Sequence, residues 1–129
     1  MQKRDIGDLA EQLALSWLEH HGYRKIETNY LRRSGEIDLI VQPPNRDSIV
    51  FVEVRYRRSW DFGGALVSVD RRKQLKLRRT VNAWLQHNAC AETTARIDVI
   101  GVIPRSADTP LERLWRNHEL QWVENAVEE

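Results

Sequence analysis

The chain has 129 residues, of which 41% are hydrophobic and 30% are charged, and 20 Lys and Arg residues nearly balance 19 Asp and Glu residues. This composition excludes an intrinsically disordered chain, and the length predicts one domain over residues 1–129 with a substantial buried core. The single cysteine, Cys90, excludes an internal disulfide, and the lack of an apolar run of roughly 20 residues excludes a membrane span, so we expect a cytoplasmic protein without membrane contact.

The first predicted element is a helix that begins at its N-cap, Asp5, and ends before Gly22, which has the position of a C-terminal stop residue. Apolar residues recur in this segment at i, i+3, i+4 and i+7, and they predict one buried stripe. Glu11 lies beside that stripe rather than opposite it. A strand over residues 23–31 follows, and a short turn leads from it into the next strand.

The next two apolar runs, over residues 35–41 and 49–55, predict a β-hairpin because the segment between them contains two prolines, an Asn and an Asp. Pairing outward from the centre of this connection places Asp38 directly opposite Glu53. Alternation along the first strand places Asp38 on the same face as Ile40. Because both faces of both strands are largely apolar, we expect the hairpin to lie at the centre of a sheet that is covered on both sides.

Asp38 and Glu53 need a chemical explanation in this setting. Directly paired residues of an antiparallel ladder have Cβ atoms roughly 4.5–5.5 Å apart, where like charges are destabilising, and burial increases the cost. A divalent cation would remove the repulsion, and Mg²⁺ and Mn²⁺ take oxygen ligands. We therefore predict a Mg²⁺ or Mn²⁺ site with Asp38 and Glu53 as ligands, completed by the backbone carbonyl of Val54 and by Glu11. The alternative is a hydrogen-bonded carboxyl pair that shares a proton without metal.

Residues 55–79 form a strongly basic stretch, since two aspartates are its only acidic residues. The stretch contains a loop over residues 59–67, in which Trp60 could stack on a base, and the start of a second helix that Ser68 caps and that ends at about His87. A cationic stretch next to a carboxylate pair is typical of proteins that handle phosphates, and a solvated helix face is the alternative. The residues predicted to contact nucleic acid are Arg57, Arg58, Arg71, Arg72, Lys73, Gln74 and Lys76.

Two further segments complete the expected sheet. Residues 94–103 form a predicted strand, and residues 111–123 are expected to be extended, with a bend near Asn117. The whole pattern predicts an α/β or α+β fold, in which helices cover a central mixed sheet of four to five strands.

An Asp on one strand followed by Glu-x-Lys on the next resembles the core of the PD-(D/E)xK nucleases, which include restriction endonucleases and archaeal Holliday-junction resolvases. Over nearly its whole length the chain also resembles the YraN family of uncharacterised bacterial proteins. The segments that carry this resemblance are Gly35-Glu36-Ile37-Asp38-Leu39-Ile40, Phe51-Val52-Glu53-Val54-Arg55-Tyr56-Arg57, Phe62-Gly63-Gly64-Ala65 and Lys73-Gln74-x-Lys76. The resemblance implies a restriction-endonuclease-like fold, with Glu11, Asp38 and Glu53 as its acidic cluster and Arg55 in the position of the lysine.

Arg55 is a departure from the nuclease pattern. Arginine stays protonated at any working pH, so Arg55 cannot act as a general base. We expect it to clamp a phosphate and to stabilise transition-state charge, while metal alone activates the attacking water. The alternative is a structural ion pair with Glu36, which the predicted register places opposite Arg55.

The leading hypothesis is a metal-dependent DNA endonuclease, with Asp38, Glu53, Arg55 and Glu11 as catalytic residues and a metal-activated water as nucleophile. By analogy with resolvases, the substrate would be branched DNA and the protein would act as a homodimer. One alternative is a nucleic-acid-binding module that keeps the fold with little or no catalysis, which Arg55 favours. Another is an interaction protein whose acidic C-terminal segment docks to a larger assembly.

Overall fold

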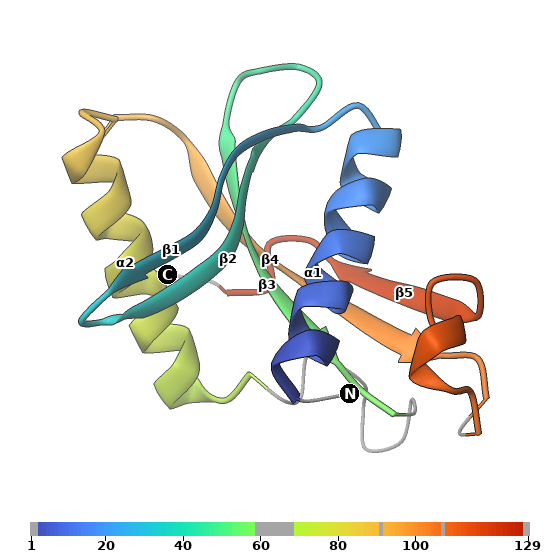
Figure 1. The fold of residues 1–129 in the computed structure, drawn as a ribbon. Helices are drawn as coiled ribbons and strands as arrows, with labels where there is room; N and C mark the ends of the chain where they lie inside the picture. The colour runs from blue at the N-terminus through green and yellow to red at the C-terminus, as the bar shows by residue number, and fades with distance from the viewer. Residues whose placement is uncertain (1–2, 59–68, 91, 107, 128–129) are drawn as a thin grey trace.

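The computed structural model describes residues 3–58, 69–90, 92–106 and 108–127, and these residues form one five-stranded sheet with the strand order β1-β2-β3-β4-β5 (Figure 1). The elements are α1 (Lys3–His20), β1 (Arg24–Arg32), β2 (Gly35–Gln42), β3 (Ile49–Tyr56), α2 (Arg71–His87), β4 (Ala95–Pro104), the 3₁₀ helix η3 (Leu111–Arg113) and β5 (His118–Val123). Neighbouring strands are antiparallel, except that β3 and β4 are parallel. The predicted α/β class with a mixed sheet is therefore confirmed.

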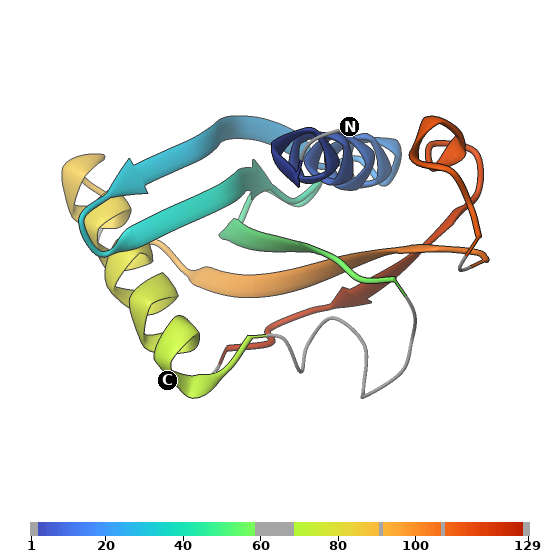
Figure 2. The same ribbon diagram turned by 60° about the horizontal axis from the view of Figure 1, so that its bottom comes forward.

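The two helices cover different sides of the strands, as Figure 2 shows. Apolar side chains of α1 pack in one buried cluster, here called the α1-side cluster, which contains Ala14, Leu18, Leu39, Val41, Val50, Val52 and Ile100. Apolar side chains of α2 pack in the α2-side cluster, which includes Ile37, Ile40, Phe51, Leu77, Val81, Trp84 and Val99. Burying one such large side chain contributes about 1.5–3 kcal/mol. The hairpin of β2 and β3 is therefore covered on both sides, as its apolar pattern predicted.

Gly22 ends α1 as the sequence predicted, whereas the helix begins at Lys3 and places Asp5 in its first turn rather than at the N-cap. Gly22 has a φ of 87°, and the N–H of Tyr23 donates to the carbonyl of Leu18 at 3.0 Å. This six-residue closure is the Schellman arrangement that satisfies the last carbonyls of a helix. Within the described residues, no helix has the length and apolar character that crossing a membrane requires.

The N-cap of α2 differs from the predicted one. Ser68, the predicted cap, lies outside the described residues, and the structure shows Asp70 in the N-cap position. The carboxylate of Asp70 accepts a hydrogen bond from the N–H of Lys73 at 2.8 Å. Aspartate is among the best N-cap residues because its oxygen satisfies a free N–H of the first turn. The helix ends at His87, as expected.

The expected extended conformation of residues 111–117 is wrong. Residues Leu111–Arg113 form a 3₁₀ helix, and the carbonyl of Arg113 accepts a hydrogen bond from the N–H of Asn117 at 3.0 Å. Pro110 precedes this turn, and the fixed φ of proline favours the start of a helix. Only His118–Val123 is extended, and it forms the edge strand β5 against β4.

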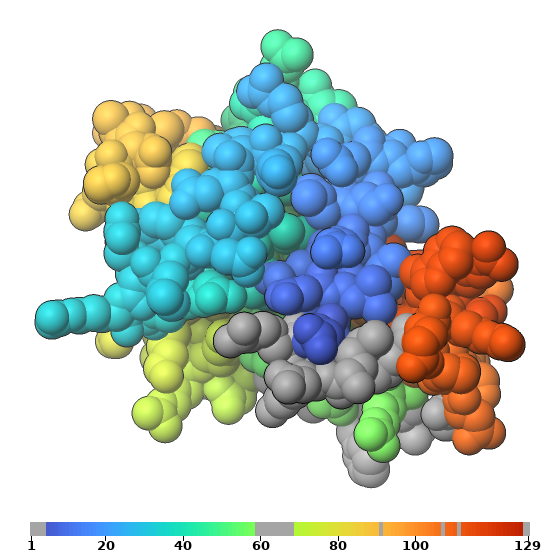
Figure 3. Space-filling model, viewed as in Figure 1, coloured from blue at the N-terminus to red at the C-terminus, as the bar shows by residue number. Residues whose placement is uncertain are grey.

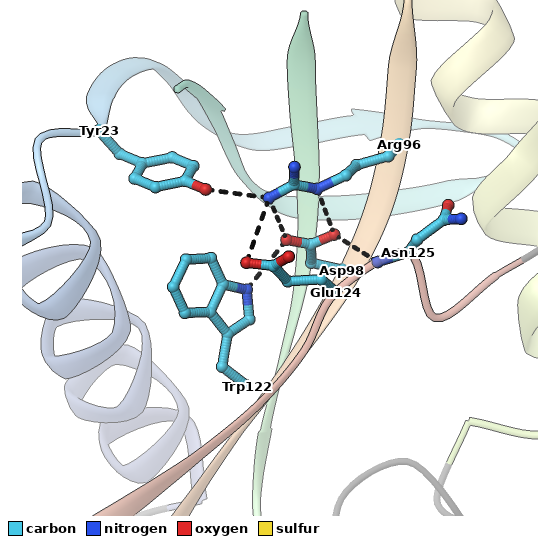
Figure 4. Close-up of polar contacts among 6 residues, drawn as sticks. All are labelled: Tyr23, Arg96, Asp98, Trp122, Glu124 and Asn125. Carbon is cyan, nitrogen blue, oxygen red and sulfur yellow. Dashed lines mark hydrogen bonds and ion pairs between the residues drawn. The ribbon is translucent and has the colours of Figure 1, made fainter. Parts of the chain in front are cut away.

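A buried aspartate on β4 joins the C-terminal part of the chain to the rest (Figure 4). Asp98 accepts hydrogen bonds from Arg96, which donates from both Nε (3.0 Å) and Nη2 (3.2 Å). It also accepts from Nε1 of Trp122 and from the backbone N–H of Asn125, both at 2.9 Å. Arg96 in turn donates to the hydroxyl of Tyr23 at 3.0 Å. Because N–H groups satisfy both oxygens, the buried carboxylate is neither unpaired nor uncompensated.

Candidate active site

The β2–β3 hairpin has the predicted register, and its ladder ends just before Asp38 and Glu53. The last pair, Leu39 with Val52, belongs to the register that places Asp38 next to Glu53. One step further, the N–H of Val54 donates to Oδ2 of Asp38 at 2.8 Å. The side chain of Asp38 therefore occupies the end of the ladder, and it binds the backbone of the neighbouring strand.

Three carboxylates converge near this end of the hairpin. Glu11 on α1, together with Glu36 and Asp38 on β2, places one carboxylate oxygen each within 4.8 Å of the other two. Oε1 of Glu11 also accepts a hydrogen bond from Nδ2 of Asn29 on β1 at 2.8 Å. Figure 3 shows the face of the molecule on which α1 packs beside the β1–β2 pair. Glu36 is the site residue that the sequence argument missed, and its only signal is its position two residues before Asp38.

Burial perturbs the titration of these groups. Burial raises the pKa of Asp38 to about 7, and the negative charge of Glu11 adds to this rise, while the hydrogen bond from Val54 opposes it. Burial also raises the pKa of Glu11, although hydrogen bonds with Asp38 and Asn29 oppose that rise. The two carboxyls therefore hold their protons to higher pH than exposed carboxyls do.

Asp38 reaches this group of carboxylates because β2 loses its regular alternation at this point. Leu39 packs in the α1-side cluster, whereas Ile37 and Ile40 both pack in the α2-side cluster. On the adjacent strand, Asn29 has a φ of 52°, a left-handed conformation that a regular strand does not contain. The prediction that Asp38 shares a face with Ile40 is therefore wrong, since the carboxylate of Asp38 lies near the carboxylate of Glu11 on α1.

Glu53 lies outside this group of three and has cationic neighbours. It is 4% exposed, and burial raises its pKa to about 7, with the charge of Asp38 adding to the rise. Lys73 and Arg55 oppose that rise, because Nζ of Lys73 lies 3.6 Å and Nε of Arg55 lies 3.2 Å from Oε1 of Glu53. The Arg55 contact is electrostatic rather than an aligned hydrogen bond, since Nε of Arg55 is buried without a hydrogen-bond partner. The alternative in which Arg55 pairs with Glu36 is wrong, because Arg55 lies against Glu53.

The predicted nucleic-acid contacts lie in three different settings. Lys73 contacts Glu53, whereas the side-chain amide of Gln74 donates a hydrogen bond to the carbonyl of Val69 at 3.0 Å. The exposed members on α2 are Arg71, Arg72 and Lys76. Arg57 and Arg58 line a separate open pocket of about 440 Å³ after β3. Trp60 and residues 62–65 lie outside the described residues.

The oxygen-rich donor set fits a divalent cation. Three carboxylates within reach of one ion, two of them with a raised pKa, place negative charge where a cation would compensate it. Glu11, Glu36 and Asp38 are the residues that could hold Mg²⁺ or Mn²⁺ together. Of the other predicted ligands, Val54 contributes its N–H to Asp38, and Glu53 is held by two cations.

Comparisons with known proteins give a family and no activity. A family model described as "Uncharacterised protein family UPF0102" matches residues 10–102. A UPF0102 protein of Stutzerimonas stutzeri (strain A1501) is 41% identical over an alignment of 129 positions that covers 98% of either chain. Another, from Pseudomonas syringae pv. syringae (strain B728a), is 46% identical over 101 residues, which cover 78% of this chain and 80% of that protein. UPF0102 protein VSAL_I2655 of Aliivibrio salmonicida (strain LFI1238) is 37% identical over an alignment of 129 positions that covers 98% of this chain and 94% of that protein.

Proposed function

This chain belongs to the uncharacterised protein family UPF0102, and we propose that it is a metal-dependent nuclease that hydrolyses phosphodiester bonds in DNA. The resemblance to the YraN family, which is this family, is confirmed, and the relation to PD-(D/E)xK nucleases is part of the proposal. The observation that carries the proposal is the convergence of the carboxylates of Glu11, Glu36 and Asp38 beside the buried Glu53.

The acidic residues divide into two roles under this proposal. Glu11, Glu36 and Asp38 would hold Mg²⁺ or Mn²⁺, with Glu53 as a further ligand or as a proton acceptor. Such a cation supplies Lewis-acid chemistry, since it stabilises charge on a phosphate and lowers the pKa of water. Because the pKa of Glu53 is about 7, its carboxyl can exchange a proton near neutral pH.

Cations beside the carboxylates support phosphate as the reacting group. Arg55 and Lys73 both contact Glu53, so positive charge lies next to the acidic cluster. Nε of Arg55 lacks a hydrogen-bond acceptor, and phosphate oxygens are strong acceptors for guanidinium groups. The exposed side chains of Arg71 and Arg72 give α2 further positive charge for the DNA backbone. Branched DNA as the preferred substrate rests on fold analogy alone.

The test is cleavage of labelled linear, single-stranded and four-way-junction DNA with Mg²⁺ or Mn²⁺. The wild type is compared with Asp38→Asn and Glu53→Gln, which keep side-chain shape and remove the charge. Asp47→Asn is the matched control, because Asp47 is exposed in the loop between β2 and β3. We expect metal-dependent cuts by the wild type and by the control, with a loss of at least about 100-fold in the other two variants.

The second candidate is a binding module that uses the same fold without cleavage, and the position of Arg55 favours it. The permanent positive charge of Arg55, 3.2 Å from Glu53, partly compensates the negative charge of that carboxylate. Glu53 therefore has less need of a metal ion. This function predicts DNA binding that weakens steeply with salt and that Asp38→Ala leaves unchanged. If no metal supports cleavage while all variants still bind DNA, the nuclease proposal is wrong and the binding function replaces it.

A further inference from the structure

A cavity of about 480 Å³ lies between α2, the start of β4 and the segment after β5. Its polar wall includes Arg78, Asn82, Thr93 and Thr94. Its apolar wall includes Val81 and Ile97, which belong to the α2-side cluster. The volume lies within the range of about 300–1,000 Å³ that small-molecule sites occupy. The cavity shares no residue with the carboxylate cluster or with the cations beside Glu53.

Arg78 is the unusual member of this wall. Its Nη2 is buried and has no hydrogen-bond partner. Within the ranges that the structure describes, Arg78 is not part of any ion pair. A buried guanidinium N–H that is not bonded has lost water without a replacement, and such groups are rare in folded proteins. An acceptor bound in the cavity would give Nη2 the hydrogen bond that it lacks, and no existing hydrogen bond of Nη2 would be broken.

The charged side chains among the described residues that line the cavity are two arginines. Among residues 3–58, 69–90, 92–106 and 108–127, none that lines the cavity is an Asp or a Glu. The second arginine of the wall is Arg96, but its guanidinium is committed to Asp98 and to the hydroxyl of Tyr23 (Figure 4). The positive charge of Arg96 is therefore compensated by Asp98, whereas no carboxylate in the described part of the chain forms an ion pair with Arg78.

We propose that this cavity binds a small organic anion, whose carboxylate or phosphate group is held by Arg78 and whose apolar part packs on Val81 and Ile97. The planar fork of a guanidinium matches both oxyanions in geometry and charge. The side chains of Asn82, Thr93 and Thr94 supply neutral hydrogen-bonding groups around the same space. The site is distinct from the proposed nuclease site, so either can exist without the other.

The test is an NMR titration of the ¹⁵N-labelled protein with benzoate and with phenyl phosphate, each of which joins an oxyanion to an apolar ring. Benzamide, which has the shape of benzoate without its charge, is the ligand control. We expect saturable shifts at the amides of Thr93, Thr94 and Ile97 with one or both anions, and none with benzamide. The relative affinity for benzoate and phenyl phosphate decides whether the natural group is a carboxylate or a phosphate.

Arg78→Gln should weaken the binding at least 10-fold, whereas Arg79→Gln is the matched control, because Arg79 is the exposed neighbour on α2. Asn82→Asp, which places a negative charge on the same wall, should weaken it as well and guards against misfolding of the first variant. The thermal midpoint of Arg78→Gln should be no lower than that of the wild type, because no hydrogen bond of Nη2 is lost. Equal affinity in wild type, Arg78→Gln and Asn82→Asp, equal shifts with benzamide, or no saturable shift with either anion would overturn the proposal.

Discussion

Asp38 and Glu53 make the stability of the fold depend on pH. Burial raises the pKa of Asp38 from an ordinary 3.8, and that of Glu53 from 4.5, in each case to about 7. Between these ordinary values and about 7 the folded protein therefore binds more protons than the unfolded chain. The stabilisation that this difference gives is fully present below the ordinary values and is lost as the pH rises through about 7.

We expect the free energy of unfolding, measured with urea in metal-free buffer, to fall by about 5 kcal/mol between about pH 5 and 8, with roughly equal contributions from the two carboxyls. Asp38→Asn should make this dependence weaker, because an amide has no proton to lose in that range. Asp47→Asn, in the exposed hairpin loop, should retain the wild-type dependence. A wild-type slope in Asp38→Asn would show that Asp38 titrates at an ordinary pH.

Under the proposed function, the residue at position 55 would limit how fast the site can cleave a phosphodiester. Arg55 cannot accept a proton, whereas a lysine in the same place could do so when it is desolvated. Under the proposed function, Arg55→Lys should raise the rate of metal-dependent cleavage, by about 10-fold if a general base is what the site lacks. Single-turnover cleavage at several pH values measures the effect. An unchanged or lower rate would mean that the guanidinium itself serves the reaction.

At the scale of elements, the end of α1 is fixed by a close approach to the β2–β3 loop. A Cβ added to Gly22 would lie 2.9 Å from Cγ of Pro44, and its φ of 87° is unfavourable for other residues. Gly22→Ala should therefore lower the free energy of unfolding by about 1–2 kcal/mol in a urea titration.

The matched control for Gly22→Ala is Gly7→Ala. Gly7 lies within α1, and a Cβ added there meets nothing within 4 Å. Because alanine favours a helix over glycine, this change should raise the free energy of unfolding by about 0.5–1 kcal/mol. Two substitutions of the same kind in one helix should thus have opposite signs. A loss of stability in both would mean that α1 tolerates no added methyl group for another reason.

At the scale of the whole molecule, the uneven charge predicts where DNA would bind. Arg71 and Arg72 are exposed at the start of α2, and the next residue of this helix, Lys73, contacts Glu53. Replacing both arginines by Gln should weaken DNA binding and reduce the slope of log affinity against log salt by about 2. The control replaces Arg113 and Arg116, which are exposed near η3, and should leave the slope unchanged. Fluorescence anisotropy at several salt concentrations distinguishes the two outcomes.

The sequence predicts the sheet and the hairpin register well because those features have local causes. The turn residues between β2 and β3 set the register that brings Asp38 to Glu53, and two-sided burial follows from the apolar pattern of the strands. The orientation of Asp38 does not follow from the strand pattern, because β2 loses its alternation between Ile37 and Leu39 beside the left-handed Asn29 of the neighbouring strand. Strand alternation carries no information about such a tertiary irregularity.

The membership of the acidic cluster was harder to predict for a related reason. Extending the β2–β3 register assigns Glu36 to Arg55, yet that ladder ends at Leu39, and the residues before Leu39 remain paired with β1 alone. Glu36 therefore does not face Arg55, and its carboxylate lies near those of Glu11 and Asp38. Arg55 and Lys73 then meet at Glu53, although they come from different elements. Contacts of this kind are decided by helix placement, which the sequence pattern of one strand does not contain.

The buried Asp98 has a consequence for the lifetime of the folded state. Asp98 is bonded to Trp122 and Asn125, and its partner Arg96 is bonded to Tyr23. The network therefore connects parts of the chain that are far apart in sequence. Closing loops of that size costs entropy before the contacts form, which predicts that the network is completed after the folding transition state. Asp98→Asn should then accelerate unfolding and leave the refolding rate nearly unchanged in stopped-flow experiments. The hydrogen bonds of Figure 4 would thus set the unfolding rate, and with it the time for which residues 122–125 stay bound to β4.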